Sequence, residues 1–175
     1  MSDIVLSATG LVMRFGGITA TNNVTLNLRR GARHALIGPN GAGKTTLINL
    51  LTGVLTPTEG RIVLEGEDIT RLAPHRRVAR GMVRTFQINQ LFDSMTPLET
   101  LALVVSQHSG VGAQWWRPLG SSTAVAERAG QLLEQFRLAD VAGQQTRHLA
   151  YGKRRLLEIA IALACEPRVL LLDEP

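Results

Sequence analysis

Two groups of residues in this sequence have the types and spacing needed for phosphate chemistry. The first runs from Gly38 to Thr46 and fits the pattern G-x-x-x-x-G-K-[ST], in which a glycine-rich turn leads into a helix. Its glycines let the backbone turn several N–H groups inward, and such a nest at a helix N-terminus binds anions. The second is the pair Asp173 and Glu174, which follows an apolar stretch. Together they predict a site for a phosphate-bearing ligand.

The residues of the first group have distinct expected roles toward a nucleotide. Lys44 can reach the β- and γ-phosphates, and the Thr45 hydroxyl is placed to ligate the Mg²⁺ that neutralises them. Thr46 can support the loop. The predicted nucleotide-binding residues are Gly38, Pro39, Asn40, Gly41, Ala42, Gly43, Lys44, Thr45 and Thr46. A glycine-rich turn that only connects a strand to a helix is the alternative, and the flanking sequence disfavours it.

Apolar periodicity predicts the elements that hold these groups. Ala35 to Ile37 should form a strand that enters the turn, and the apolar residues within 47–51 follow at helical spacing. Arg168 to Leu172 should form a strand that delivers the acidic pair to one edge of a sheet. There Asp173 can hold Mg²⁺ through water, and Glu174 can polarise the water that attacks a γ-phosphate. The alternative is an ordinary turn after a buried strand.

Two isolated side chains could complete such a site. Phe15 ends a short β-prone segment, and its ring could stack on an adenine base or, equally well, pack in the core. Gln87 ends the β-prone segment from Met82 to Gln87. Its amide could ligate Mg²⁺, position the attacking water or report the γ-phosphate to a mobile segment. A plain surface glutamine is the alternative.

The rest of the chain divides into a β-rich part and a helical part. The other predicted strands are Ile4 to Ala8, Leu11 to Phe15, Val24 to Leu28, Arg61 to Leu64 and Asp68-Ile69, with turns at Gly10, Gly16-Gly17 and Asn22-Asn23. The other predicted helices are Pro74 to Arg80, one that starts at Thr96 with a capping-box Glu99, Ala124 to Phe136, and one from the Leu149 to Lys153 segment to about Ala164. Ser109 to Ser122 should be a loop.

Composition places further bounds on function. The chain has 19 Lys+Arg against 14 Asp+Glu in 175 residues, but its basic residues are scattered and not interleaved with aromatics. A single cysteine, Cys165, cannot form an internal disulfide, and the histidines lack metal-ligand spacing. No apolar run approaches the roughly 20 residues that cross a bilayer. We therefore expect a cytoplasmic protein whose only membrane role is peripheral.

The phosphate loop, Gln87, the Leu149 to Lys153 segment and Leu170 to Pro175 resemble, in order and spacing, the ATP-binding cassette (ABC) ATPases. Met13 to Gly17, Arg84 to Gln87 and the helix after Leu149 are most similar to the branch that serves branched-chain amino-acid uptake in bacteria. The resemblance implies ATP and Mg²⁺ as cofactors. It makes Phe15 the base-stacking aromatic, Gln87 the Q-loop residue and metal ligand, Leu149 to Lys153 the signature motif with contacts from Ala150 and Gly152, and Asp173 and Glu174 the Walker B pair.

The resemblance also implies a fold and partners. The fold is α/β, a P-loop NTPase (RecA-like) core with an N-terminal antiparallel β-subdomain and a helical subdomain, incomplete at the C-terminus. The core would span 1–92 and 166–175, and the helical signature subdomain 93–165. Two ATPase subunits, identical or different, would pair head to tail. Permease subunits would contact the Gln87 to Met95 region at the inner face of the membrane, and no nucleic acid is expected.

Two departures from the family pattern qualify these expectations. Ala150 lacks the hydroxyl of the usual signature serine and Tyr151 replaces a glycine, whereas Gly152 keeps its backbone donor. The family also continues beyond Walker B with a central strand and a switch histidine, so we expect no ATP turnover by these 175 residues alone. An ABC-type ATPase acting on nucleic acid and a nucleotide-binding module without turnover are the alternative functions.

Overall fold

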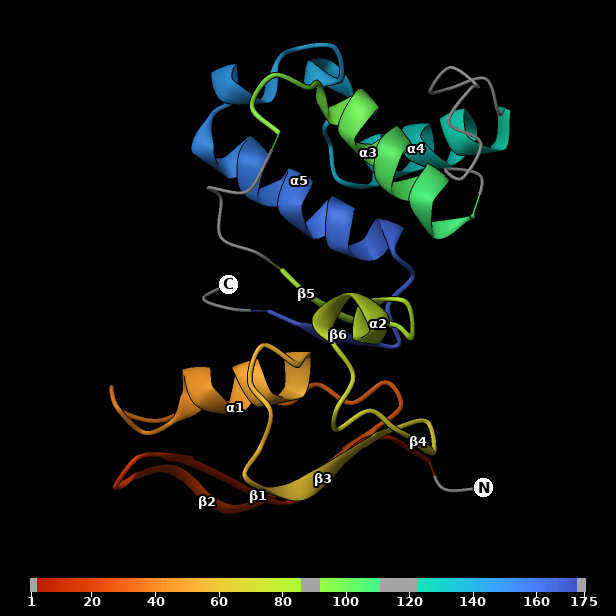
Figure 1. The fold of residues 1–175 in the computed structure, drawn as a ribbon. Coiled ribbons are helices and arrows are strands. Elements are labelled where there is room, and N and C mark those ends of the chain that lie inside the picture. Colours follow the sequence, from red (N-terminus) through yellow and green to blue (C-terminus); the bar gives the residue numbers. More distant parts are fainter. Residues whose placement is uncertain (1–2, 86–91, 111–122, 173–175) are drawn as a thin grey trace. The chain divides into compact units, whose positions relative to one another are not determined.

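The computed structural model describes residues 3–85, 92–110 and 123–172. The chain forms two compact units, Met1–Met82 and Val83–Pro175, each with both helices and strands (Figure 1). The predicted α/β class is therefore confirmed. The division into a core of 1–92 with 166–175 and a helical subdomain of 93–165 remains a prediction. Among the described residues, no helix is long and apolar enough to cross a membrane.

The first unit is built on a four-stranded antiparallel sheet in the order β2-β1-β3-β4. Its elements are β1 (Ile4–Phe15), β2 (Ile18–Arg29), α1 (Lys44–Thr52), β3 (Glu59–Leu64), β4 (Glu67–Asp68) and α2 (Pro74–Val78). α1 lies along one face of this sheet (Figure 1). Its Leu47, Leu50 and Leu51 are buried, as their helical spacing predicts, and Gly53 ends the helix with φ 81°.

The predicted break at Gly10 is wrong, because the segments 4–8 and 11–15 form one strand. Gly10 has φ 62° and lies where the β1–β2 and β1–β3 registers shift. A glycine in the left-handed region accommodates a bulge without ending the ladder, so it bends the strand and does not terminate it. The predicted turn at Asn22-Asn23 likewise lies inside β2, with Asn23 at φ 50°. The turn at Gly16-Gly17 is confirmed.

The predicted strand from Ala35 to Ile37 is also wrong. Residues 32–39 form no regular element, and Leu36 and Ile37 are 48% and 89% exposed. A strand exists only where a neighbouring strand accepts and donates its backbone hydrogen bonds, and neither sheet of the described chain includes this segment. Apolar composition alone is therefore not sufficient to form a strand in this segment.

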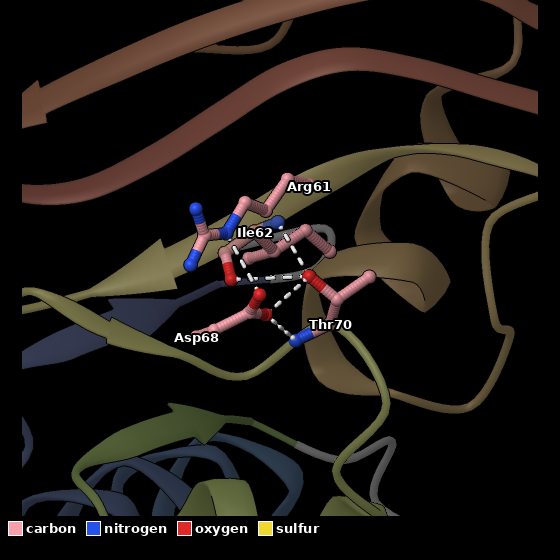
Figure 2. Close-up of polar contacts among 4 residues, drawn as sticks. All are labelled: Arg61, Ile62, Asp68 and Thr70. Atoms are coloured by element: carbon pink, nitrogen blue, oxygen red, sulfur yellow. Dashed lines mark hydrogen bonds and ion pairs between the residues drawn. The ribbon is translucent and has the colours of Figure 1, made fainter.

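A polar network closes the β3–β4 hairpin (Figure 2). Asp68 Oδ1 accepts hydrogen bonds from the Thr70 N–H at 2.9 Å and the Thr70 hydroxyl at 2.6 Å, while Oδ2 accepts from Arg61 Nε at 2.7 Å. The Ile62 N–H in turn donates to Thr70 Oγ1 at 2.9 Å. These bonds, from Thr70 first and Arg61 second, lower the pKa of Asp68 from its ordinary value of 3.8 to about 2.

This network predicts a pH dependence of folding. Because the folded-state pKa of Asp68 is depressed, its contribution to stability is present above pH 3.8 and is lost as the pH falls toward about 2. Asp68→Asn should lower the melting temperature at neutral pH, and the difference from the wild type should shrink between pH 4 and pH 2. Thermal melts followed by circular dichroism across this range test the prediction, and a difference independent of pH would contradict it.

The second unit packs three helices around one core. Its elements are β5 (Met82–Arg84, which begins at the boundary), α3 (Pro97–His108), α4 (Thr123–Gln135), the short 3-10 helices η3 (Ala139–Val141) and η4 (Thr146–His148), α5 (Tyr151–Ala164) and β6 (Val169–Leu171). Leu101, Ala129, Leu138, Leu157 and Ala160 are fully buried in the core. The capping box of α3 is confirmed: Thr96 Oγ1 accepts from the Glu99 N–H at 3.2 Å, and Glu99 accepts from the Thr96 N–H at 2.8 Å.

β5 and β6 form a two-stranded sheet, and the Thr85 N–H donates to the Leu171 carbonyl at 3.0 Å just beyond β5. This pairing joins the two strands predicted from Met82 to Gln87 and from Arg168 to Leu172. Gln87, Asp173, Glu174 and most of the predicted loop from Ser109 to Ser122 lie outside the described residues.

Candidate nucleotide site

The predicted phosphate loop has the backbone of an anion nest. Gly41 and Gly43 lie in the left-handed region with φ 81° and 82°, and the Ala42 N–H donates to the Pro39 carbonyl at 3.2 Å. α1 begins directly after the loop, at Lys44, and its N-cap residue, Gly43, has no side chain that could accept a capping hydrogen bond. The N–H groups in the first turn of α1 therefore have no side-chain acceptor from the N-cap residue. Such free donors at a helix N-terminus can bind an anionic ligand.

The Lys44 ammonium is held over this loop. Its Nζ donates to the Gly38 carbonyl at 2.6 Å and to the Pro39 carbonyl at 2.8 Å. An ammonium has three N–H donors, so a third remains for a phosphate oxygen while the other two brace the loop. Thr45 lies in the first turn of α1 and is exposed, which leaves its hydroxyl accessible to a metal ion bound there.

Strand β2 packs directly against the loop at Gly43. A Cβ added to Gly43 would lie 2.5 Å from the carbonyl oxygen of Ala20 and 3.6 Å from Thr21 Cγ2. Contacts this close leave no room for a side chain, and the φ of 82° at Gly43 also disfavours one. The conformation of the loop is thus determined by β2 as well as by its own glycines.

The β1–β2 turn places an apolar pair near this contact. Phe15 and Ile18 face each other across the two-residue turn and are 47% and 71% exposed. Ala20, which touches the loop at Gly43, follows Ile18 by two residues on the same strand. The exposed ring of Phe15 is therefore available to stack on a base, and Ile18 is a neighbouring apolar side chain that the sequence analysis missed. The signal that could have found Ile18 is its place opposite Phe15 in a tight turn.

The Leu149 to Lys153 segment forms the start of α5. Ala150 is the N-cap residue of this helix and makes no side-chain cap hydrogen bond, Gly152 lies in the first turn, and Tyr151 is 72% exposed. Lys153 Nζ donates to Asp140 Oδ1 at 2.7 Å and to the Arg137 carbonyl at 2.5 Å. The Lys153 hydrogen bond lowers the pKa of Asp140. Lys153 therefore anchors the start of α5 within its own unit.

The structure brings together only part of the predicted constellation. The loop from Gly38 to Thr46 and Phe15 belong to the first unit, and Ala150 and Gly152 to the second. The predicted metal ligands Gln87 and Asp173 and the predicted base Glu174 lie outside the described residues. Within the described ranges, no group of three His, Cys, Asp or Glu side chains could hold a metal ion. The individual roles of these residues stay predictions.

Comparison with known proteins decides the family. Residues 21–175 match the ABC transporter family. The chain belongs to that family. It is 42% identical over 182 residues to the high-affinity branched-chain amino acid transport ATP-binding protein BraF of Pseudomonas aeruginosa, and 44% identical over 183 residues to LivG of Salmonella typhimurium, which bears the same description. Both alignments cover 100% of this chain and 71% of the relative.

Solved structures agree with this assignment. An ATP-binding cassette of an ABC transporter in its ADP conformation matches with a TM-score of 0.82 at 31% identity, covering 97% of this chain and 68% of that one. A nucleotide-free ATP-binding cassette matches with a TM-score of 0.81 at 32% identity, covering 98% of this chain and 69% of that one. The predicted ABC family, P-loop NTPase fold and ATPase function are therefore confirmed, with ATP as the nucleotide.

Proposed function

We propose that this ABC ATPase powers an importer of branched-chain amino acids. The observation that carries the proposal is the braced phosphate loop at the start of α1, with Lys44 Nζ 2.6 Å from the Gly38 carbonyl, in a chain whose relatives are described as branched-chain amino acid transport ATP-binding proteins. The loop indicates phosphate binding, and the descriptions of the relatives indicate the class of transported solute.

The site residues divide into binding and chemical roles. The loop N–H groups and Lys44 bind the phosphates, and Phe15 stacks on the base. Mg²⁺, held by Thr45, Gln87 and Asp173, would neutralise phosphate charge. Glu174 acts as the general base that activates water, with Gln87 placing that water near the γ-phosphate. The hydroxyl oxygen of Thr45 and the carboxylate oxygens of Asp173 are of the kind that Mg²⁺ prefers.

A second subunit would complete the site. Ala150 and Gly152 at the start of α5 offer backbone donors and the positive end of a helix dipole to the nucleotide of a partner ATPase subunit, identical or different. Permease subunits would contact the Gln87 to Met95 region at the inner face of the membrane. In this region Phe92 is 54% exposed, which supports a partner surface there, and Leu98, three residues beyond the region in the first turn of α3, is 42% exposed.

Ion pairing disfavours a nucleic-acid partner. Several basic side chains are paired with acidic side chains of the same unit, which lowers the charge available to a phosphate backbone. These pairs are Arg14 with Glu59, Arg30 with Glu65, Arg61 with Asp68, Arg80 with Glu67, Lys153 with Asp140 and Arg155 with Glu158. A basic groove that follows a nucleic-acid backbone needs unpaired Lys and Arg side chains.

Lys44→Ala tests the phosphate-loop assignment. We expect the variant to bind Mg-ATP more weakly by about 1.5 to 3 kcal/mol, the usual worth of a hydrogen bond to a charged group. Isothermal titration calorimetry of the full chain measures this loss. Arg76→Ala removes an exposed cation from α2 and should bind as the wild type does. Equal affinities for Mg-ATP in the wild type and Lys44→Ala would refute the assignment.

A further inference from the structure

Arg77 is a buried cation whose hydrogen bonds go to backbone carbonyls. It lies in α2, and only 1% of its surface is exposed. Its Nη1 donates to the carbonyls of Leu50 and Leu51, both at 2.7 Å, its Nε to Leu72 at 2.9 Å, and its Nη2 to Thr70 at 2.8 Å. Within the described part of the chain, no ion pair joins it to a carboxylate. A guanidinium stays protonated even when burial lowers its pKa, as it does here.

Two of these four carbonyls belong to the last turn of α1. Carbonyls at a helix C-terminus have no partner within the helix and form its negative end, so a buried cation satisfies them and offsets that charge. The packing around this contact is close: a Cβ on Gly53 would lie 2.6 Å from Arg77 Nε and 2.8 Å from the Leu72 carbonyl oxygen. The other two carbonyls belong to the connection from β4 to α2, where Thr70 is part of the network in Figure 2. Arg77 thus links the end of α1 to the β3–β4 hairpin.

The opposite end of α1 is the phosphate loop. The helix has nine residues, from Lys44 to Thr52, so its two ends are about 13 Å apart at 1.5 Å per residue. A helix this short moves as one body, and a shift of its last turn shifts its first turn too. β2 constrains the chain at Gly43, the N-cap residue directly before the first turn. Arg77 constrains the last turn.

We propose that Arg77 is a positioning residue for nucleotide binding, which acts through α1 on the phosphate loop without touching the nucleotide. The inference rests on the proposed role of that loop. The bonds to Leu50 and Leu51 set the position of the N–H groups at the other end of the helix. The buried guanidinium also offsets the negative charge at the C-terminal end of α1. The positive end of the helix dipole, at the loop, then attracts an anion with less cancellation from the other end. Both effects act on the β- and γ-phosphates more than on the base.

The test compares three nucleotides that differ in the number of phosphates. Affinities of the full chain for ATP, ADP and AMP are measured by calorimetry, well below the melting temperature of each variant. Arg77→Met should weaken ATP binding by about three- to tenfold, which lies within the range for residues that couple to a ligand they do not contact. The loss should decrease from ATP to ADP to AMP. Arg77→Lys keeps the charge but has three donors in place of the planar fork, so its loss for ATP should be smaller.

Two controls separate positioning from general destabilisation. Leu6→Ala opens a cavity in the core of the same unit, where Leu6 is 1% exposed, and should lower the melting temperature without changing the ATP affinity. Arg76→Met removes an exposed cation from the same helix and should change neither quantity.

The results also distinguish this inference from the proposed function. If the wild type binds no ATP, the phosphate-loop assignment fails. If it binds ATP and Arg77→Met binds it equally well, or loses ATP and AMP affinity alike, Arg77 is a structural residue only and the inference is wrong. If Arg77→Met does not fold, the ATP affinity of Arg77→Lys is the test instead. An ATP affinity equal to that of the wild type in Arg77→Lys would overturn the inference.

Discussion

Replacing Arg77 with methionine is expected to lower the free energy of unfolding by about 3 to 5 kcal/mol, because several buried or half-buried carbonyls lose their hydrogen-bond donor. The methionine side chain fills much of the arginine volume but donates no hydrogen bond. The carbonyls of Leu50, Leu51, Leu72 and Thr70 would each lose the donor that Arg77 supplies, at buried positions for Leu50 and Leu51 and half-buried ones for Leu72 and Thr70. The Leu50 carbonyl would keep one bond, from the Gly53 N–H at 3.3 Å. Each buried group left unsatisfied costs about 1 to 3 kcal/mol before the surroundings relax.

Urea unfolding followed by circular dichroism measures this loss. Arg76→Met is the matched control, because Arg76 carries the same charge on the neighbouring position of α2 and is exposed. Surface substitutions of this kind usually change stability by less than about 0.5 kcal/mol. A loss below 1 kcal/mol in Arg77→Met would mean that water replaces the guanidinium at the end of α1, and the structural importance assigned to Arg77 would be wrong.

Replacing Gly43 with alanine is expected to abolish measurable Mg-ATP binding and to destabilise the first unit by about 3 kcal/mol or more. The added Cβ would lie 2.5 Å from the Ala20 carbonyl oxygen, closer than van der Waals contact permits, in a residue with φ 82°. Either the loop moves away from β2 or it leaves the left-handed conformation. Both changes redirect the N–H groups that form the anion nest.

Calorimetric titration with Mg-ATP and thermal unfolding of the same samples test this expectation together. Gly130→Ala is a suitable control, because Gly130 lies within α4, has no atom within 4 Å of the added Cβ, and gains helix propensity from the change. That variant should be as stable as the wild type or more so. ATP binding by Gly43→Ala within twofold of the wild type would show that the loop tolerates a side chain and adapts around it.

Local sequence was sufficient to predict the features that depend on neighbouring residues. The phosphate loop and the start of α1 follow from glycines, a lysine and apolar helical spacing within a single short segment. The capping box at Thr96 and Glu99 and the start of α5 near Leu149 depend on contacts three or four residues apart. The family assignment also followed from motif order, since motifs are local patterns.

Features that depend on distant parts of the chain were decided by the tertiary structure alone. Gly10 resembles a turn in sequence, but pairing with both β2 and β3 continues the strand through it. The segment from Ala35 to Ile37 is apolar, yet in the described chain no strand pairs with it, and it forms no strand. Arg77 resembles its exposed neighbour Arg76 in sequence. What distinguishes Arg77 is its hydrogen bonds to carbonyls up to 27 residues away. Local sequence periodicity does not reveal a hydrogen-bond partner at that distance along the chain.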